Sequence, residues 1–237
     1  DRAGYVAVRF WDGLDFENDP RAVDSAFVER SFANFGAMLA VARDEDVTEA
    51  IDRLLGRARA NRTAAALVAA MADKYLGEGE SPVFDEDVYL AFLNRYKAVA
   101  GGGDALDEKI VLASRNAPGV GVADFGMVMR DGRRSTLRAE LGGGECLVMF
   151  YDSDCEHCRE AMTDVVMSPL SDRMKVVAVD VAGDREKWES ANVTMPEAWA
   201  VGFATEDVEE SDKYFFRRMP TIYVVDGGRV VSRSPRL

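Results

Sequence analysis

The sequence predicts two folded parts, a small all-α region followed by an α/β region. The spacing of the apolar residues changes from helical to strand-like after Asn116-Ala117-Pro118-Gly119, a turn-forming stretch that ends the first pattern. In the second half, short apolar runs alternate with helical stretches and end in a hairpin, an order typical of α/β folds. We therefore predict a helical domain over residues 1–115 and an α/β domain over residues 116–237.

Composition restricts the classes of function that fit this chain. It has 237 residues, 48% of them hydrophobic, and a formal net charge of −13, as is typical of a globular protein with one or two domains. The acidic balance argues against nucleic acid as a partner, because binding to phosphates needs a basic face. Three cysteines and one histidine are too few for a disulfide scaffold, a four-thiolate zinc site or any site that needs two histidines.

Apolar stripes predict several short helices in the first half. The first stripe consists of Val28, Phe32, Phe35 and Leu39, and similar stripes run through residues 47–58, 67–75 and 89–96. Asp19 followed by Pro20 is a favourable start for the first of these helices. The other expected boundaries are Gly77, where the third helix ends, Asp85, where the fourth begins, and Asp104, which caps a last helix through Ser114. Packed together, such helices form a small bundle.

Three apolar runs predict strands in the second half. Residues 146–151 form a continuous apolar run, as expected for a central strand that is covered on both faces, and residues 174–181 and 221–225 form the other two. Asp226-Gly227-Gly228 predicts a tight turn into a further strand at residues 229–231. Helical patterns fit residues 156–167, 184–191 and 207–217.

Cys155-Glu156-His157-Cys158 directly follows the first of these strands and opens the next helix. Unpaired N–H groups and the helix dipole stabilise negative charge at a helix N-terminus, so we expect Cys155 to be the reactive thiolate. Cys158 lies one turn further along the helix, from where it can attack a mixed disulfide formed on Cys155. The spacing therefore predicts a reversible dithiol–disulfide pair.

The same cysteines allow two other interpretations, half of a zinc site and a static disulfide. A zinc site would need further ligands, and the chain offers only Cys146, which we expect to be a core residue because it lies inside a predicted strand. A static disulfide between cysteines this close requires a backbone geometry that is seldom available. Redox chemistry is therefore the favoured interpretation.

Met219-Pro220-Thr221 opens a predicted strand about 60 residues after the two cysteines. Proline cannot donate a hydrogen bond to a strand ladder, so it is expected at the start or the edge of a strand. Taken alone, the pattern fits an ordinary trans proline equally well.

Together these motifs resemble exported thioredoxin-like thiol–disulfide oxidoreductases of the TlpA/ResA type. The matching segments in residues 123–237 are Ala123-Asp124-Phe125, Asp152-Ser153-Asp154, the Cys-x-x-Cys and Met219-Pro220-Thr221. The whole chain is similar to a Bacteroidetes-type envelope family that places a helical domain of unknown function, of the DUF5106 kind, before a thioredoxin-like domain. The segments that carry this second likeness are Trp11-Asp12-Gly13-Leu14-Asp15-Phe16, Lys74-Tyr75-Leu76 and Asn116-Ala117-Pro118-Gly119.

The resemblance implies a thioredoxin fold, with a central mixed sheet flanked by helices. It implies that Pro220 is a cis-proline facing the active disulfide and that the backbone of Met219 pairs with an extended peptide substrate. It also implies a secretory or lipoprotein signal ahead of Asp1, which is not an initiator methionine.

His157 is expected to modulate the cysteine pair. A cation there would favour the Cys155 thiolate and make the disulfide more oxidising. Asp152, Asp154 and Glu156 oppose this effect, because nearby negative charge raises the pKa of a thiol. We therefore expect a reduction potential between those of strongly reducing and strongly oxidising members of the fold.

We therefore predict a thiol–disulfide oxidoreductase with no metal and no cofactor beyond the redox-active Cys155–Cys158 disulfide. Cys155 exchanges with the substrate, Cys158 resolves the intermediate, and Met219-Pro220-Thr221 shapes the peptide groove. The expected partners are protein or peptide thiols and disulfides of the cell envelope and an upstream electron donor. By resemblance, the direction is reduction or isomerisation, and the protein is periplasmic or lipoprotein-anchored after export.

Two alternatives belong to other classes. The first is a non-catalytic thioredoxin-like binding module whose helical domain recruits a partner; an inert, buried thiol at Cys155 would favour it. The second is a metallochaperone, which Cys155, His157 and Cys158 fit poorly because they lie too close in sequence to enclose a metal.

Overall fold

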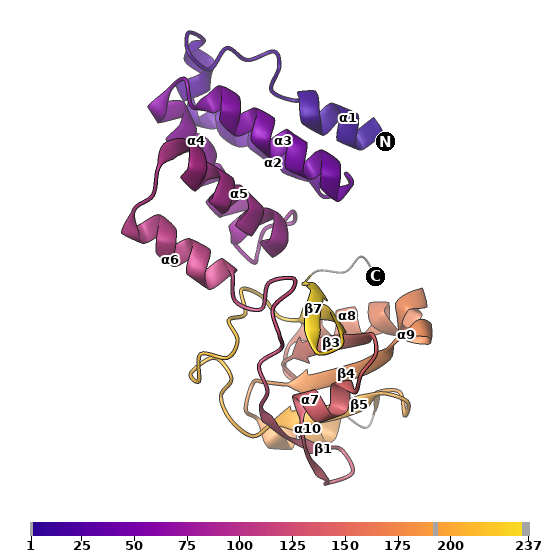
Figure 1. The fold of residues 1–237 in the computed structure, drawn as a ribbon. Helices are drawn as coiled ribbons and strands as arrows, with labels where there is room; N and C mark the ends of the chain where they lie inside the picture. The colour runs from indigo at the N-terminus through magenta and orange to yellow at the C-terminus, as the bar shows by residue number, and fades with distance from the viewer. Residues whose placement is uncertain (1, 192–193, 234–237) are drawn as a thin grey trace. The chain divides into compact units, whose positions relative to one another are not determined.

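Residues 2–191 and 194–233 are described by the structure, a computed structural model. The chain divides into two units, Asp1–Ser114 and Arg115–Leu237 (Figure 1). Each buried hydrophobic cluster lies within a single unit. Within the described part of the chain, no helix is long and apolar enough to cross a membrane.

The first unit is helical, as predicted. Its elements are α1 (Arg2–Arg9), the 3₁₀ turn η1 (Pro20–Val23), α2 (Ser25–Leu39), α3 (Asp44–Ala58), α4 (Arg62–Ala72), the π turn η2 (Asp73–Gly77), α5 (Glu86–Ala100) and α6 (Asp104–Ala113). The apolar stripes form one core, in which the ring of Phe32 lies 5.7 Å from that of Phe35 and 6.4 Å from that of Phe92. The first of these edge-on contacts lies within α2, and the second, between Phe32 and Phe92, joins α2 to α5.

Two of the predicted helix starts are wrong. Asp19 and Pro20 begin the short turn η1 rather than the long helix α2. The N-cap of α2 is Asp24, whose side chain accepts a hydrogen bond from the Phe27 N–H. Asp104 is the first residue of α6, and Gly103 occupies the cap position. Asp85 does cap α5, as predicted.

The second unit is built on a mixed sheet of seven strands in the order β2-β1-β5-β4-β3-β6-β7. The elements are β1 (Gly126–Met129), β2 (Arg134–Thr136), α7 (Leu137–Leu141), β3 (Cys146–Tyr151), α8 (Glu156–Met167), α9 (Pro169–Arg173), β4 (Lys175–Asp180), α10 (Arg185–Ala191), β5 (Ala200–Ala204), β6 (Thr221–Asp226) and β7 (Arg229–Ser232). Strands β3, β4 and β5 are parallel, and the remaining pairs are antiparallel. The predicted fold class, a central mixed sheet with helices after an all-α part, is confirmed.

Strand β3 lies in the middle of this sheet and is buried along its whole length. Alternate side chains enter different cores, because successive residues of a strand point to opposite faces. Phe150 belongs to the cluster that includes Leu137 of α7, whereas Tyr151 belongs to the cluster that includes Cys158 of α8 and Trp188 of α10. The helix that carries the two cysteines therefore packs on the Tyr151 face.

The helix predicted over residues 207–217 is wrong. The Asp207 side chain accepts hydrogen bonds from the Glu209 and Glu210 N–H groups, which resembles a helix start. The Tyr214 N–H then donates a hydrogen bond of 3.0 Å to the Val208 carbonyl oxygen, six residues earlier, and no helix forms. This irregular segment buries Tyr214 against the sheet.

Candidate active site at the end of strand β3

Cys155 occupies the N-cap position of α8. The chain leaves β3 at Tyr151 and makes a tight turn, in which the Cys155 N–H donates to the Asp152 carbonyl oxygen at 3.1 Å. The Cys155 Sγ accepts a hydrogen bond from the Cys158 N–H at 3.3 Å. Its sulfur thus satisfies one of the otherwise unpaired N–H groups at the helix start.

The two thiols differ in burial. Cys155 is partly exposed, whereas Cys158 is fully buried, and both are free in this structure. Burial raises the pKa of Cys158 to about 12. Cys155 is therefore the sulfur that a partner in solution can reach, and Cys158 is a protonated thiol held behind it.

Cys146, at the opposite end of β3, is a core residue as predicted. It is 1% exposed, and its thiol donates a hydrogen bond to the Leu141 carbonyl oxygen at 2.9 Å. Burial raises its pKa. It takes no part in the site at the other end of the strand.

The segment Met219-Pro220-Thr221 lies at the same end of the sheet as the cysteines. Thr221 begins β6 and pairs with Phe150 of β3, so Pro220 and Met219 continue beside the residues that follow β3. The Met219–Pro220 peptide bond is cis, and Met219 packs against the same cluster as Cys155. All three residues are half-buried, which leaves part of the segment open to a partner.

Glu156 and His157 form the first turn of α8, and both are exposed. The expected tuning of the cysteine pair by His157 stays a prediction.

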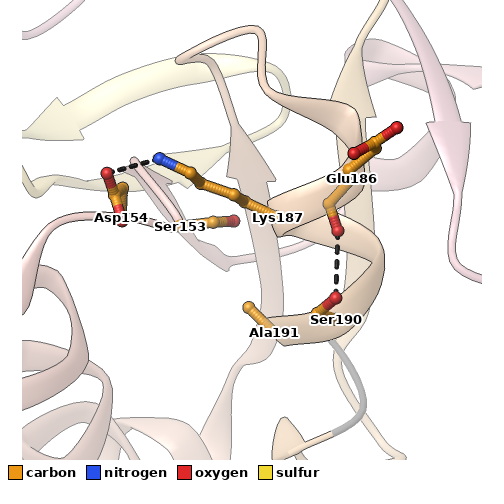
Figure 2. A pocket seen from close by; sticks show the side chains of 6 residues that line it. All are labelled: Ser153, Asp154, Glu186, Lys187, Ser190 and Ala191. Atoms are coloured by element: carbon orange, nitrogen blue, oxygen red, sulfur yellow. Dashed lines mark hydrogen bonds and ion pairs between the residues drawn. The ribbon is translucent and has the colours of Figure 1, made fainter.

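Sequence reasoning missed an ion pair beside Cys155. The Lys187 Nζ atom reaches from α10 to the Asp154 carboxylate at 2.6 Å, as Figure 2 shows. The two side chains border an open pocket of about 420 Å³ that is also lined by Ser153, Glu186, Ser190 and Ala191. Only the fold brings α10 to this loop, because Lys187 is 33 residues from Asp154 in the sequence.

Sequence reasoning also missed Asp180, a fully buried carboxylate at the end of β4. It accepts hydrogen bonds from the Ser153 N–H at 2.9 Å, from the Ser153 hydroxyl and from the Ala182 N–H at 3.0 Å. Burial raises its pKa. These bonds fasten the turn that carries Cys155 to the neighbouring strand.

Among the described residues, no group of three or more histidine, cysteine, aspartate or glutamate side chains is arranged to hold a metal ion.

Comparison with known proteins gives a family-model match within the first unit and a likeness of fold to solved structures. Residues 1–108 match the model of a domain of unknown function, DUF5106. No curated protein matches the chain. A thioredoxin-like protein from Bacteroides caccae, known from a crystal structure, has 19% sequence identity and a TM-score of 0.78; the match covers 99% of this chain and 89% of that chain.

Two further matches are confined to about half of this chain. A conserved protein of unknown function from Bacteroides fragilis has 29% identity and a TM-score of 0.46, over 51% of this chain and 93% of that chain. The thioredoxin domain of a thiol–disulfide oxidoreductase from Bacteroides vulgatus has 20% identity and a TM-score of 0.45, over 51% of this chain and 90% of that chain. The present chain is thus similar to the DUF5106 model over residues 1–108 and shares a fold with a thioredoxin-like protein.

Proposed function

We propose that this protein is a thiol–disulfide oxidoreductase that acts on cysteine-containing proteins or peptides through Cys155 and Cys158. One observation carries the proposal: a partly exposed cysteine caps a helix, with a buried cysteine one turn behind it whose N–H donates to the first sulfur. This arrangement suits disulfide exchange, because a partner can reach the first thiol and the second thiol lies one helical turn behind it.

In the reducing direction, the Cys155 thiolate attacks one sulfur of a substrate disulfide. A Cys155–substrate bond forms, the substrate's own S–S bond breaks, and the other substrate sulfur leaves and takes a proton from water. Cys158 then loses its proton and attacks the Cys155 Sγ, which releases the second substrate thiol. The substrate gains two electrons, the pair becomes a disulfide, and a separate electron donor must reduce it again.

The half-buried segment Met219-Pro220-Thr221 is the proposed peptide groove beside Cys155. The sheet register supports this role, because it places the segment next to the residues that follow β3. An extended substrate lying there would present its sulfur to Cys155 and pair with the Met219 backbone.

The proposal is tested with the Cys158→Ser variant, which retains the attacking thiol but cannot resolve. We expect it to accumulate mixed disulfides with a protein substrate, visible as reducible adducts by mass spectrometry. Cys155→Ser should form none, and Cys146→Ser, a matched change of a buried cysteine away from the site, should behave like wild type. The wild-type protein should also reduce insulin in the presence of dithiothreitol. Absence of both adducts and insulin reduction would contradict the proposal and favour the non-catalytic binding module.

We also propose that the protein acts in the cell envelope, periplasmic or lipoprotein-anchored. The resemblance to exported oxidoreductases supports this location. The codons upstream of Asp1 should encode a secretory or lipoprotein signal. An upstream sequence without a signal of either kind would contradict it.

A further inference from the structure

Helix α8 borders a second pocket, mostly apolar, that the exchange steps above do not use. Its volume is about 380 Å³, and it lies between α8 and the segment that precedes β5. The α8 wall consists of Arg159, Met162, Thr163, Val166 and Met167. The volume is within the range of pockets that bind small ligands, about 300–1,000 Å³.

The opposite wall of this pocket is held in place by one guanidinium group. Arg130, the residue after β1, donates hydrogen bonds to carbonyl oxygens at 3.3 Å on Met195, 2.8 Å on Pro196, 2.6 Å on Glu197 and 2.8 Å on Trp199. The side chains of Met195 and Trp199 line the pocket and are buried. A wall that is fixed before binding loses little conformational freedom when a ligand arrives.

The α8 wall exposes apolar side chains to solvent. Val166 is 45% exposed and Met167 is 79% exposed, although both stand beside a pocket that could cover them. Exposed apolar side chains that gather around a pocket are typical of a surface on which another molecule packs. Methionine suits such a surface, because its flexible side chain adapts to partners of different shape.

The pocket lies on the face of α8 that carries Cys155. Counted from Cys155, the α8 residues of the pocket stand at i+4, i+7, i+8, i+11 and i+12, which is the spacing of one helical face. Met162 and Cys155 also pack against the same buried cluster. At a rise of about 1.5 Å per residue, Met162 and Val166 lie about 10 and 16 Å from Cys155 along the helix. An extended peptide covers these distances in about three to five residues, at about 3.3 Å each.

Arg159 stands between Cys155 and the apolar part of the pocket. Among the described residues that line this pocket, it is the one with a charged side chain, and that side chain forms no ion pair within the described part of the protein. Its charge lowers the pKa of Asp154, the residue before Cys155. Glu156 and Glu160 are its exposed neighbours on α8, so we expect its attraction for an anion to be modest.

We propose that the pocket binds a large apolar side chain of the substrate, four residues from the substrate's reactive cysteine, and that Arg159 binds a carboxylate two residues from that cysteine. This inference rests on the function proposed above. Residues i, i+2 and i+4 of an extended chain point to one side, so the sulfur, the carboxylate and the apolar side chain can all face α8. The substrates selected in this way are proteins or peptides in which a cysteine, an acidic residue and a large apolar residue alternate with other residues.

The experiment measures attack by Cys155 alone, in the full chain with Cys146→Ser and Cys158→Ser. Each probe is a short flexible peptide whose single cysteine is joined to thionitrobenzoate by a disulfide. The Cys155 thiolate bonds to the peptide sulfur, the bond to thionitrobenzoate breaks, and thionitrobenzoate leaves with the electron pair. Its absorbance gives the second-order rate constant, and the further change Cys155→Ser provides the blank.

A peptide with leucine four residues from its cysteine should react about tenfold faster than the same peptide with serine there. One series places the leucine before the cysteine and a second series places it after, and the gain should appear in one of them. Leucine three residues from the cysteine should give no gain, because it then points to the other side of the extended chain. Equal rates for leucine and serine in both series, or an equal gain at three residues, would overturn the proposal.

Val166→Arg should remove the leucine gain, because it places a charge in the pocket from an exposed position on the helix. Val111→Arg is the matched control, since Val111 is an exposed valine of helix α6, and it should retain the gain. If Val166→Arg does not fold, as judged by circular dichroism, Met167→Arg takes its place. A gain that survives the pocket variant, or that Val111→Arg also removes, would overturn the assignment to this pocket.

The carboxylate is tested with glutamate or glutamine two residues from the cysteine. Glutamate should react about threefold faster at low salt, and Arg159→Gln should remove this difference. Equal rates for the two peptides would overturn the contact with Arg159. Release from every peptide that is no faster than in the Cys155→Ser blank would instead overturn the proposed function, and this proposal with it.

Discussion

The most direct prediction concerns the difference in reactivity between the two cysteines. The change consists of two single-thiol variants, one that retains Cys155 and one that retains Cys158, each with the other two cysteines replaced by serine. Burial raises the pKa of Cys158 from 9.0 to about 12, which lowers its thiolate fraction at neutral pH by about 10³-fold, since each pKa unit is a factor of ten. Only the thiolate is alkylated.

We therefore expect iodoacetamide to modify Cys158 at least ~10³-fold more slowly than a thiol with the ordinary pKa, because full burial adds a steric barrier to this chemical one. Replacing Cys155 removes a neighbour that contributes to the shift, but burial, its largest cause, stays. Cys155 is partly exposed and should react readily.

The assay is timed alkylation at pH 7 with quantification by mass spectrometry, repeated in denaturant, where the two variants should react alike. The Cys158 rate in the folded protein should rise about tenfold per pH unit as long as the protein stays folded. Similar rates for the two cysteines in the folded protein would refute the assignment of Cys155 as the attacking sulfur and Cys158 as the resolving one.

Three further predictions concern stability. Phe150 is 1% exposed and its ring lies 4.8 Å from that of Tyr214, so Phe150→Ala should destabilise the sheet unit by about 3–5 kcal/mol in denaturant unfolding. A loss under about 1 kcal/mol would contradict this packing. Phe92→Ala, a matched change in the helical core, should leave the rate of Cys155 alkylation unchanged. Burial raises the pKa of Asp180 above its ordinary 3.8, so the folded state binds this proton more tightly than the unfolded state does. The free energy of unfolding should therefore fall as the pH rises from 3.8 through the raised pKa. Asp180→Asn should flatten this dependence on pH, and an unchanged dependence would contradict the effect of burial. Lys187→Met should leave the Tm unchanged, because both partners of the ion pair with Asp154 are exposed, whereas a clear fall in Tm would show that the pair holds the turn.

The sequence reveals the central strands because their composition has a single structural explanation. Residues 146–151 are all apolar, and a strand in the middle of a sheet is covered on both faces, so the predicted and observed bounds coincide. The hairpin after β6 is equally readable, since Gly227 and Gly228 adopt the positive φ angles, 54° and 75°, that its tight turn requires. The Cys-x-x-Cys is recognisable for a similar reason, because all its parts are local.

Features that depend on residues distant in the sequence cannot be predicted from local patterns. Strand β5 contains Gly202, which weakens a strand pattern, yet a side chain there would press on the Met127 sulfur at 3.2 Å. The glycine is explained only by the neighbouring strand β1. Asp180 is similar, because an acid at the end of an apolar run reads as the polar end of a strand. Its hydrogen bonds to Ser153, 27 residues earlier, exist only once β3 and β4 have paired.

The turn that carries Cys155 is held at several points, and they affect different properties. The cap on α8 sets the environment of the Cys155 sulfur, the β3–β6 register sets the position of Met219-Pro220-Thr221, and the bonds from Ser153 to Asp180 tie the turn to β4. Phe150 faces the opposite core, so a change there weakens the sheet without altering the groups around the buried thiol. A change at Asp180 instead removes the acceptor of the Ser153 bonds, so it acts on the turn that carries Cys155. Substitutions that lower the stability of this unit should therefore be separable from substitutions that alter the reactivity of its thiols, because adjacent residues of β3 point to opposite faces of one sheet.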